Sequence, residues 1–178
     1  MGMYDWLFHE FKKETYDGDG VQPSLQAYFR GGLDIPGAVI HLPYRAYTKT
    51  GVVSRTPHFH RDEEYLAFVG HDLRNAFESF DAEVELWLGE TLDDMEKIVI
   101  TAPTMVRIPQ YYWHGPLEIK RLGKPLFFQP VLFSSRYYAI RREVDEQGKE
   151  HFIGDVEGIT PCSLDREKKC TFCGKCGK

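Results

Sequence analysis

The sequence predicts an all-β fold, a sandwich or a barrel, and two observations support this. Short apolar or alternating runs follow one another at fairly regular intervals from about residue 36, separated by Gly, Pro and charged turns. These runs are rich in Val, Ile, Phe and Tyr, which favour strands. The predicted strands lie within 38–47, 64–69, 82–88, 97–101, 104–108, 114–120, 126–133 and 137–142.

The length and composition are those of one folded domain. A chain of 178 residues can bury a sizeable core, and 42% hydrophobic with 14% aromatic residues is enough to fill it. This composition argues against disorder over the whole chain. The net charge of -5 argues against a nucleic-acid surface as the main function. It is compatible with a small-molecule substrate.

Residues 1–35 are expected to form a helical extension outside the barrel. Apolar side chains recur there at the spacing of one helical face, at Tyr4, Leu7, Phe8 and Phe11, which predicts a helix over 4–14. The segment 17–20 breaks this helix, and residues 24–30 favour another short one. Charges interrupt the amino-terminal segment, so it does not resemble a secretory signal. Since no run is long enough to span a bilayer, we expect a cytoplasmic protein with no membrane contact.

Residues 57–65 contain the clearest candidates for chemistry. His58 and His60 are one residue apart, so on a strand they point to the same side. Imidazole and carboxylate groups are usual ligands of transition metals. Glu64 would share a face with the apolar residues of the next predicted strand. Asp62 is an alternative carboxylate, which we interpret as a solvated turn residue.

A third histidine lies at the start of a later strand. The predicted strand 104–108 ends before Pro109, and a turn follows that delivers His114. This places a fourth candidate ligand where it can join the other three.

The spacing of these residues resembles the two motifs of the cupin superfamily. The first motif, HxH followed by E and later by Gly, stands here as residues 58–64, with Gly70 one place early. The second, PxGxxH, stands as residues 109–114. The resemblance spans about residues 36–142. It implies a double-stranded β-helix, or jelly-roll barrel, that holds a divalent Fe, Mn, Ni or Zn ion.

By this resemblance the metal ligands are His58, His60, Glu64 and His114. The sequence departs from the second motif at three positions, because Pro103, Tyr111 and Glu118 stand where Gly, Gly and Asn are usual. A Gly often marks a left-handed turn, so the turn before His114 is open to a different shape. No ligand position is lost.

Polar residues on the predicted strands are candidates for binding a substrate. An inward-pointing Arg would favour a carboxylate through a bidentate contact. A place on the surface or at the end of the barrel is the alternative for each. The candidates are Arg45, Tyr47, Arg107, Tyr112 and Gln129.

The cysteines form a separate cluster in residues 155–178, spaced C-x7-C-x2-C-x2-C at Cys162, Cys170, Cys173 and Cys176. Four thiolates can complete a tetrahedral Zn or Fe site, which predicts a structural metal knuckle. An iron–sulfur cluster and a reduced, flexible tail are the alternatives. Bacterial 3-hydroxyanthranilate dioxygenases are cupins with a cysteine-rich metal tail. The chain resembles them weakly, since His60 and the tail spacing depart from their pattern.

These observations predict a barrel over 36–154 that binds a metal and acts on a small polar, carboxylated or aromatic molecule. The enzyme would be a dioxygenase, or an isomerase or lyase that uses the metal as a Lewis acid. Glu64 would be a ligand only, or would also act as a catalytic base. A non-catalytic binding or sensor protein is the alternative. Because edge strands of such barrels pair between subunits, we expect a homodimer.

Overall fold

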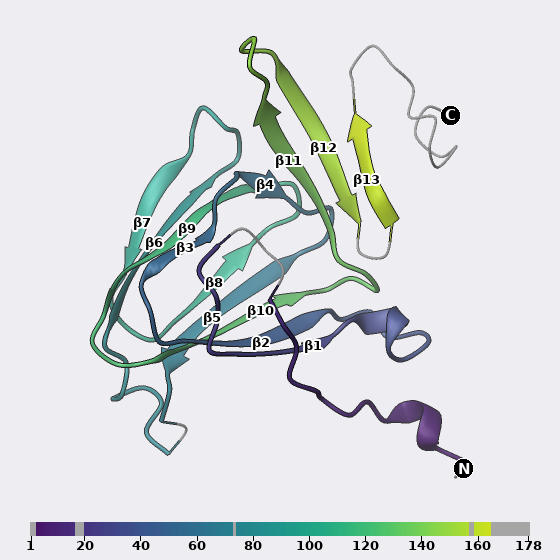
Figure 1. The fold of residues 1–178 in the computed structure, drawn as a ribbon, viewed down its shortest axis with the longest axis vertical. Helices are drawn as coiled ribbons and strands as arrows, with labels where there is room; N and C mark the ends of the chain where they lie inside the picture. The colour runs from purple at the N-terminus through teal and green to yellow at the C-terminus, as the bar shows by residue number, and fades with distance from the viewer. Residues whose placement is uncertain (1–2, 17–19, 73, 157–158, 165–178) are drawn as a thin grey trace.

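The computed structural model describes residues 3–16, 20–72, 74–156 and 159–164, and strands dominate these residues (Figure 1). Two single 3-10 turns are the only helical elements in this part of the chain, η1 (Asp5–Leu7) and η2 (Gly31–Leu33). The strands are β1 (Leu25–Phe29), β2 (Leu42–Tyr47), β3 (Gly51–Ser54), β4 (His58–Phe59), β5 (Glu64–Gly70), β6 (Ala82–Gly89), β7 (Glu96–Ile100), β8 (Thr104–Ile108), β9 (Trp113–Leu122), β10 (Leu126–Leu132), β11 (Tyr138–Val144), β12 (Glu150–Val156) and β13 (Ile159–Leu164).

The strands form two antiparallel sheets. The five-stranded sheet has the order β1-β2-β10-β5-β8, and the eight-stranded sheet has the order β13-β12-β11-β4-β9-β6-β7, with β3 paired to β9. Neighbours along the chain are often not neighbours in a sheet, as in the pairing of β10 with both β2 and β5. The chain thus crosses repeatedly between the sheets, and the architecture is the jelly-roll barrel of cupin type that the sequence predicts.

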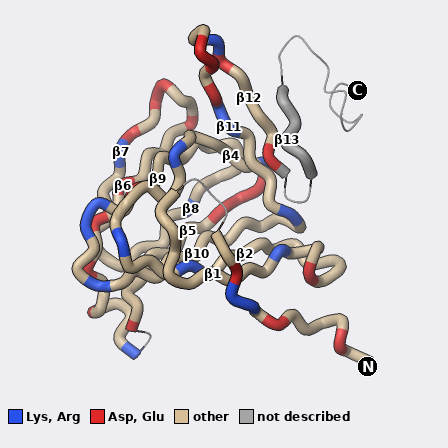
Figure 2. The backbone as a smooth tube through the Cα atoms, viewed as in Figure 1, with Lys and Arg blue, Asp and Glu red and all other residues tan. Residues whose placement is uncertain are grey.

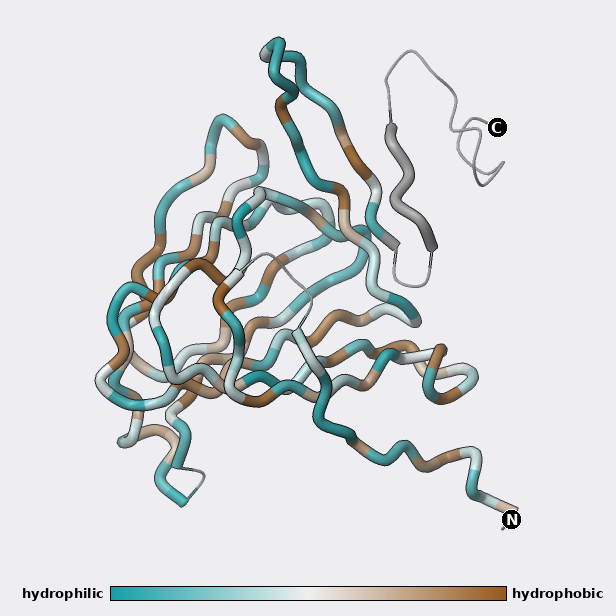
Figure 3. The backbone as a smooth tube through the Cα atoms, in the orientation of Figure 1, coloured by the Kyte–Doolittle hydropathy of each residue, from teal (hydrophilic) through white to brown (hydrophobic). Residues whose placement is uncertain are grey.

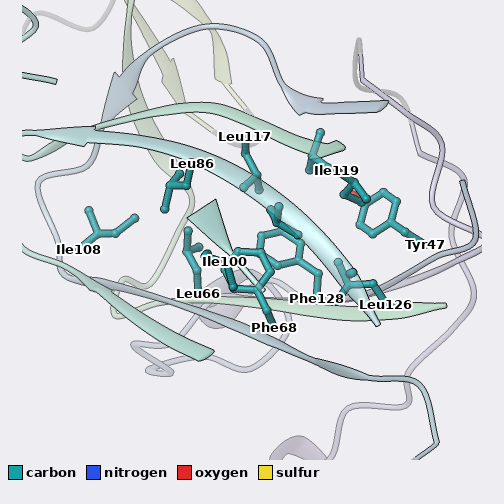
Figure 4. Close-up of a cluster of buried hydrophobic side chains, with 13 residues drawn as sticks. Tyr47, Leu66, Phe68, Leu86, Ile100, Ile108, Leu117, Ile119, Leu126 and Phe128 are labelled. Atoms are coloured by element: carbon teal, nitrogen blue, oxygen red, sulfur yellow. The ribbon is translucent and has the colours of Figure 1, made fainter. Parts of the chain in front are cut away.

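The core lies between the two sheets. Leu66 and Phe68 on β5 and Phe128 on β10 meet Leu86 on β6 and Leu117 on β9 (Figure 4). Burial alternates strictly along β5 and β10, as expected for strands with one face inside. Brown and teal residues accordingly interchange along the barrel strands (Figure 3). The same alternation places Glu64, at the start of β5, on the inner face.

The helices predicted for the first 35 residues are not formed. Residues 4–14 contain only the turn η1, after which the chain runs extended, and residues 24–30 contain strand β1. The apolar side chains of the expected helix remain exposed, at 47–79% for Tyr4, Leu7, Phe8 and Phe11. A helix this short is marginal without an apolar surface to cover it. Pairing with β2 decides the conformation of β1, so the smaller sheet includes residues 25–29. Within the described residues no helix has the length and hydropathy needed to cross a membrane.

The chain after the barrel strands continues the larger sheet. A turn at 145–148 joins β11 to β12, and the Gly148 N–H donates to the Asp145 carbonyl at 2.9 Å. Charges of both signs gather at the tip of this hairpin (Figure 2), where Arg142 pairs with Glu150. Strand β13 follows, and the backbone of Cys162 lies opposite Gly154 of β12. The other three tail residues, Cys170, Cys173 and Cys176, lie outside the described residues.

Candidate metal centre and its cavity

Strands β4 and β9 of the larger sheet and the start of β5 in the smaller sheet bring the four predicted ligands together. His58 on β4 lies directly opposite His114 on β9, and His60 and Glu64 follow on the way into β5. The ligand atoms of the three histidines all lie within 4.8 Å of one another. The Glu64 Oε2 atom is 3.1 Å from His114 Nε2 and 3.5 Å from His60 Nε2. Residues 56 positions apart in the sequence therefore share one small volume inside the barrel.

Backbone carbonyls orient all three imidazole rings. The Nδ1 atom lies 3.0 Å from the Thr56 carbonyl in His58 and 2.6 Å from the Tyr138 carbonyl in His60. In His114 it lies 3.2 Å from the Tyr112 carbonyl. A carbonyl oxygen only accepts hydrogen bonds, so each Nδ1 carries the proton and each Nε2 has a free lone pair. Metal-binding histidines are held in the same way by their second nitrogen.

The inner atoms of this cluster fit a cation. His60 Nε2, His114 Nε2 and Glu64 Oε2 are buried and have no hydrogen-bond partner among the described residues. With the tautomers above, all of them are acceptors that face one another, an arrangement that costs free energy unless a positive charge lies between them. Imidazole nitrogens with one carboxylate oxygen are a common donor set for Fe, Mn, Ni or Zn. The residues present therefore suit a divalent transition metal.

The electrostatics of the cluster shows how protons compete with a metal. Burial, and then the neighbouring His114 and His60, lower the pKa of His58 well below its usual range. Burial alone would raise the pKa of Glu64, but His60 and His114 hold it well below its usual range, so the carboxylate is ionised. Burial opposes protonation of His60, yet Glu64 raises its pKa. Because metal ligation requires neutral imidazole, metal affinity at this site should fall at low pH.

The turn before His114 keeps a left-handed conformation although Tyr111 stands where the motif has Gly. Tyr111 has a φ of 66°, and it is the one non-glycine residue with positive φ among the described residues. Its N–H donates to the His60 carbonyl at 2.8 Å, which ties the turn to the metal-ligand segment. The departure from the motif therefore changes the residue and not the sign of φ.

The left-handed conformation of Tyr111 leads to a testable prediction about stability. A side chain in the left-handed region costs roughly 1–2 kcal/mol, which Gly avoids. We expect Tyr111→Gly to be about 1 kcal/mol more stable than Tyr111→Ala in urea unfolding, because both lose the ring contact with Phe59 but only alanine keeps the strain. Equal stabilities would contradict the left-handed turn.

A cavity of about 570 Å³ opens beside the four predicted ligands. One part of its wall is apolar and is formed by core residues of both sheets. The remaining wall is polar and contains cations, phenols, an imidazole and the carboxylate of Asp155, which pairs with Arg141. The apolar part includes Leu66, Leu86, Leu117, Phe128 and Leu132, and the polar part includes Tyr16, Tyr28, His41, Arg45, Arg55, Tyr137 and Arg141.

The structure places only one of the predicted substrate-binding residues, Arg45, in the wall of this cavity. Tyr47 is fully buried in the apolar core and packs near Phe128. Gln129 points away from the cavity, because its neighbours Phe128 and Pro130 on β10 occupy the inner face.

Arg107 and Tyr112 also lie outside the cavity. The Arg107 side chain is on the outer face of β8, where Nε donates to Glu63 Oε1 at 2.5 Å. The Tyr112 hydroxyl donates to Glu90 at 2.5 Å. Strand parity and the pairing with Glu63 account for the position of Arg107. Tyr112 lies in the turn before β9 and is held by Glu90, so both residues lie outside the cavity, contrary to the sequence prediction.

Several cavity residues were not predicted as functional. The Tyr137 ring lies edge-on to His60 at 5.4 Å and tilted against His41 at 5.7 Å. Burial raises the pKa of Tyr137 to about 12. Burial, together with the cations of Arg30 and Arg45, lowers the pKa of His41 to about 4. The shared parity of His41 and Arg45 in the run 38–47 was the signal that could have identified His41.

No protein-family model matches the chain, and no curated protein matches it. Among solved structures, the chain is similar to a cupin 2 conserved barrel domain protein from Rhodopseudomonas palustris, with 13% identity and a TM-score of 0.47 over 78% of this chain and 80% of that one. It is similar to an oxalate oxidase in complex with glycolate, with 14% identity and a TM-score of 0.48 over 74% and 61%. It is also similar to an oxalate decarboxylase from Lactobacillus farciminis, with 18% identity and a TM-score of 0.48 over 74% and 33%.

The chain thus spans less than two thirds of the oxidase chain and about a third of the decarboxylase chain. These similarities lend no support to the narrower resemblance to 3-hydroxyanthranilate dioxygenases. Two antiparallel sheets enclose the core of the chain, and the histidines of the two motifs meet between them. The fold of the protein is therefore a jelly-roll barrel of cupin type.

Proposed function

We propose that this protein is a metal-dependent enzyme that acts on a small polar molecule. The observation that carries the proposal is the convergence of His58, His60, His114 and Glu64 on one buried point beside a cavity. A purely structural polar cluster would be expected to pair each acceptor with a donor, and this one does not.

The cavity suits a reaction that takes place on the metal. When bound, a divalent ion would supply a Lewis acid for substrate oxygens or a site for O₂ activation. The protein holds three imidazoles through Nδ1 and brings one negative charge, that of Glu64, to the ligand set. The apolar wall around Leu66, Leu86 and Phe128 keeps water from the inner side of the site. A dioxygenase, or an isomerase or lyase, would each be compatible with this environment.

Turnover measurements on the metal-loaded protein test the proposal. The metal-free chain is loaded separately with Fe(II), Mn, Ni and Zn and incubated with a panel of hydroxy, keto and aromatic acids, with and without O₂, and products are followed by mass spectrometry. We expect turnover that needs the metal and is lost in Glu64→Gln. It should be kept in the matched variant Glu63→Gln, whose carboxylate pairs with Arg107 outside the cavity.

The outcomes separate the candidate functions. Dependence on O₂ supports a dioxygenase, and turnover without O₂ supports an isomerase or lyase. Tight binding of panel compounds with no product from any metal form would favour a sensor or binding protein and contradict an enzyme. Failure of the wild-type protein to retain any of the four metals would contradict the metal centre itself.

Other expectations stay predictions. The second Zn or Fe site at Cys162, Cys170, Cys173 and Cys176 involves three residues outside the described part of the chain. The homodimer, the cytoplasmic location and the absence of nucleic-acid and membrane partners also await tests. So does the division of the chain into 1–35, 36–154 and 155–178.

A further inference from the structure

Arg45 is held rigidly in the cavity wall by two neutral side chains of the neighbouring strand. Strand β1 pairs with β2 so that Gln26 lies opposite Arg45. The Arg45 Nε atom donates to Gln26 Oε1 at 2.9 Å, and its Nη2 atom donates to the Tyr28 hydroxyl at 2.6 Å. Gln26 is only 2% exposed, and its amide donates to the Thr15 carbonyl at 3.3 Å. The guanidinium is therefore fixed before any ligand arrives.

This guanidinium has no counter-charge in the described part of the chain. No Asp or Glu of that part lies within ion-pair distance of it, whereas Arg107 and Arg141 each pair with a carboxylate. The groups around Arg45 are phenols instead, with the rings of Tyr16 and Tyr28 at 5.5 and 5.6 Å from Cζ. A partly buried cation without an anion is costly. The phenol of Tyr47 is also near the guanidinium, since Arg45 and Tyr47 each affect the pKa of the other. The Tyr47 hydroxyl has no hydrogen-bond partner among the described residues, and no described residue accepts from Arg45 Nη1, so this amino group can donate to a ligand.

The cavity therefore has two ends of different chemistry. Arg45 lines the same cavity as the four predicted metal ligands. His41 and Tyr137 connect the two ends, because the His41 ring lies 5.9 Å from the Tyr28 ring and 5.7 Å from the Tyr137 ring, and the Tyr137 ring lies 5.4 Å from that of His60. A small molecule in this cavity can thus meet the guanidinium with one group and the ligand cluster with another.

We propose that Arg45, positioned by Gln26 and Tyr28, binds the carboxylate of the substrate. The substrate class is then a small carboxylic acid whose second oxygen-bearing group reaches the metal. A planar guanidinium with one edge free matches the planar geometry and single charge of a carboxylate. The metal-facing half of this statement rests on the proposed function, and the Arg45 half does not.

Binding of simple acids to the metal-free protein tests the proposal. The probes are acetate, butyrate and benzoate, each compared with its neutral amide by isothermal titration calorimetry on the full chain in the presence of EDTA. In the wild-type protein we expect at least one acid to bind about tenfold or more tightly than its amide. Arg45→Gln should abolish this preference. Arg107→Gln, which removes a cation outside the cavity, should keep it.

A second variant guards against a loss of folding in Arg45→Gln. Tyr28→Phe retains the charge but releases Nη2, so it should weaken acid binding by roughly two- to fivefold. Thermal unfolding of each variant shows whether it is folded.

Three results would overturn the proposal. The first is that no acid binds better than its amide in the wild-type protein. The second is that the preference persists in a folded Arg45→Gln. The third is that phenyl phosphate binds more tightly than benzoate.

The variant His58→Ala/His114→Ala separates this inference from the proposed function. Removing two predicted metal ligands should leave the preference for acids over amides within about twofold, because Arg45 and its two partners are unchanged. Acid binding without any metal binding would support Arg45 and contradict the metalloenzyme. Metal binding without a preference for acids would support the metal centre and contradict the role of Arg45.

Discussion

His58→Ala/His114→Ala should lower metal affinity in the barrel by more than about 100-fold. Loss of groups that merely orient a metal ligand costs about 10–100-fold, so removal of two ligands costs more. The two rings lie opposite each other on β4 and β9, with centroids 4.2 Å apart, and His60 is the one further described histidine of this cluster. Elemental analysis of the purified protein should show the loss of one equivalent of a transition metal.

Two control proteins are measured beside the double variant. His71→Ala removes an exposed histidine and should leave the metal content unchanged. A chain that ends at Leu164 lacks three of the four cysteines and should lose only the metal of the predicted tail site. If the double variant retains all of its metal while the shortened chain loses it, the barrel cluster does not bind metal and the proposed function fails.

Phe68→Ala should lower the free energy of unfolding by about 3–5 kcal/mol, the usual cost of removing a buried phenylalanine side chain. Phe68 is 1% exposed and stacks on Phe128 of the neighbouring strand, with ring centroids 4.9 Å apart. The cavity left by the ring would lie between the two sheets, where both strands are fixed by backbone pairing and relax little. Urea unfolding measured by circular dichroism gives the difference.

Met105→Ala is the control for this variant. Met105 lies on β8, which pairs with β5, but its side chain is 62% exposed on the outer face. We expect its effect to stay within about 0.5 kcal/mol. A loss below about 1 kcal/mol for Phe68→Ala would mean that the core does not lie between the sheets as described.

The barrel strands were predictable because their signals are local. The run 104–108 coincides with β8, and the run 64–69 agrees with β5 to within one residue. Each has side chains whose character suits one buried face, and such a pattern needs no knowledge of the partner strand. Short strands cannot be identified in this way, because β3 and β4 have too few residues to show an alternation.

The candidate metal ligands were predictable for a related reason. His58 and His60 share a face through strand parity, and the motif spacing associates them with Glu64 and His114. The orientation of the rings was not predictable. It depends on the carbonyls of Thr56, Tyr138 and Tyr112, and the Tyr138 carbonyl belongs to a strand 78 residues away from His60.

In residues 1–35 the local sequence pattern predicts helices that do not form. The apolar spacing at Tyr4, Leu7, Phe8 and Phe11 has the period of a helix, yet these side chains remain 47–79% exposed, with Phe11 partly covered by the Tyr44 ring. Residues 24–30 have no strong alternation, yet they form a strand because β2 offers an unpaired edge. Tertiary pairing outweighs a weak local preference of either kind.

For this protein, the order of residues was enough to establish an all-β class, most of the barrel strands and the four candidate ligands. The two-residue period of the strands and the spacing of the ligands in the two motifs can be read from the chain alone. Which polar side chains face the cavity was decided only in three dimensions. Arg45 and Arg107 look alike in the sequence, but β1 holds the first in the cavity wall with Gln26 and Tyr28, and Glu63 holds the second outside. Those partners come from segments 17 to 44 residues away, and only folding brings them together.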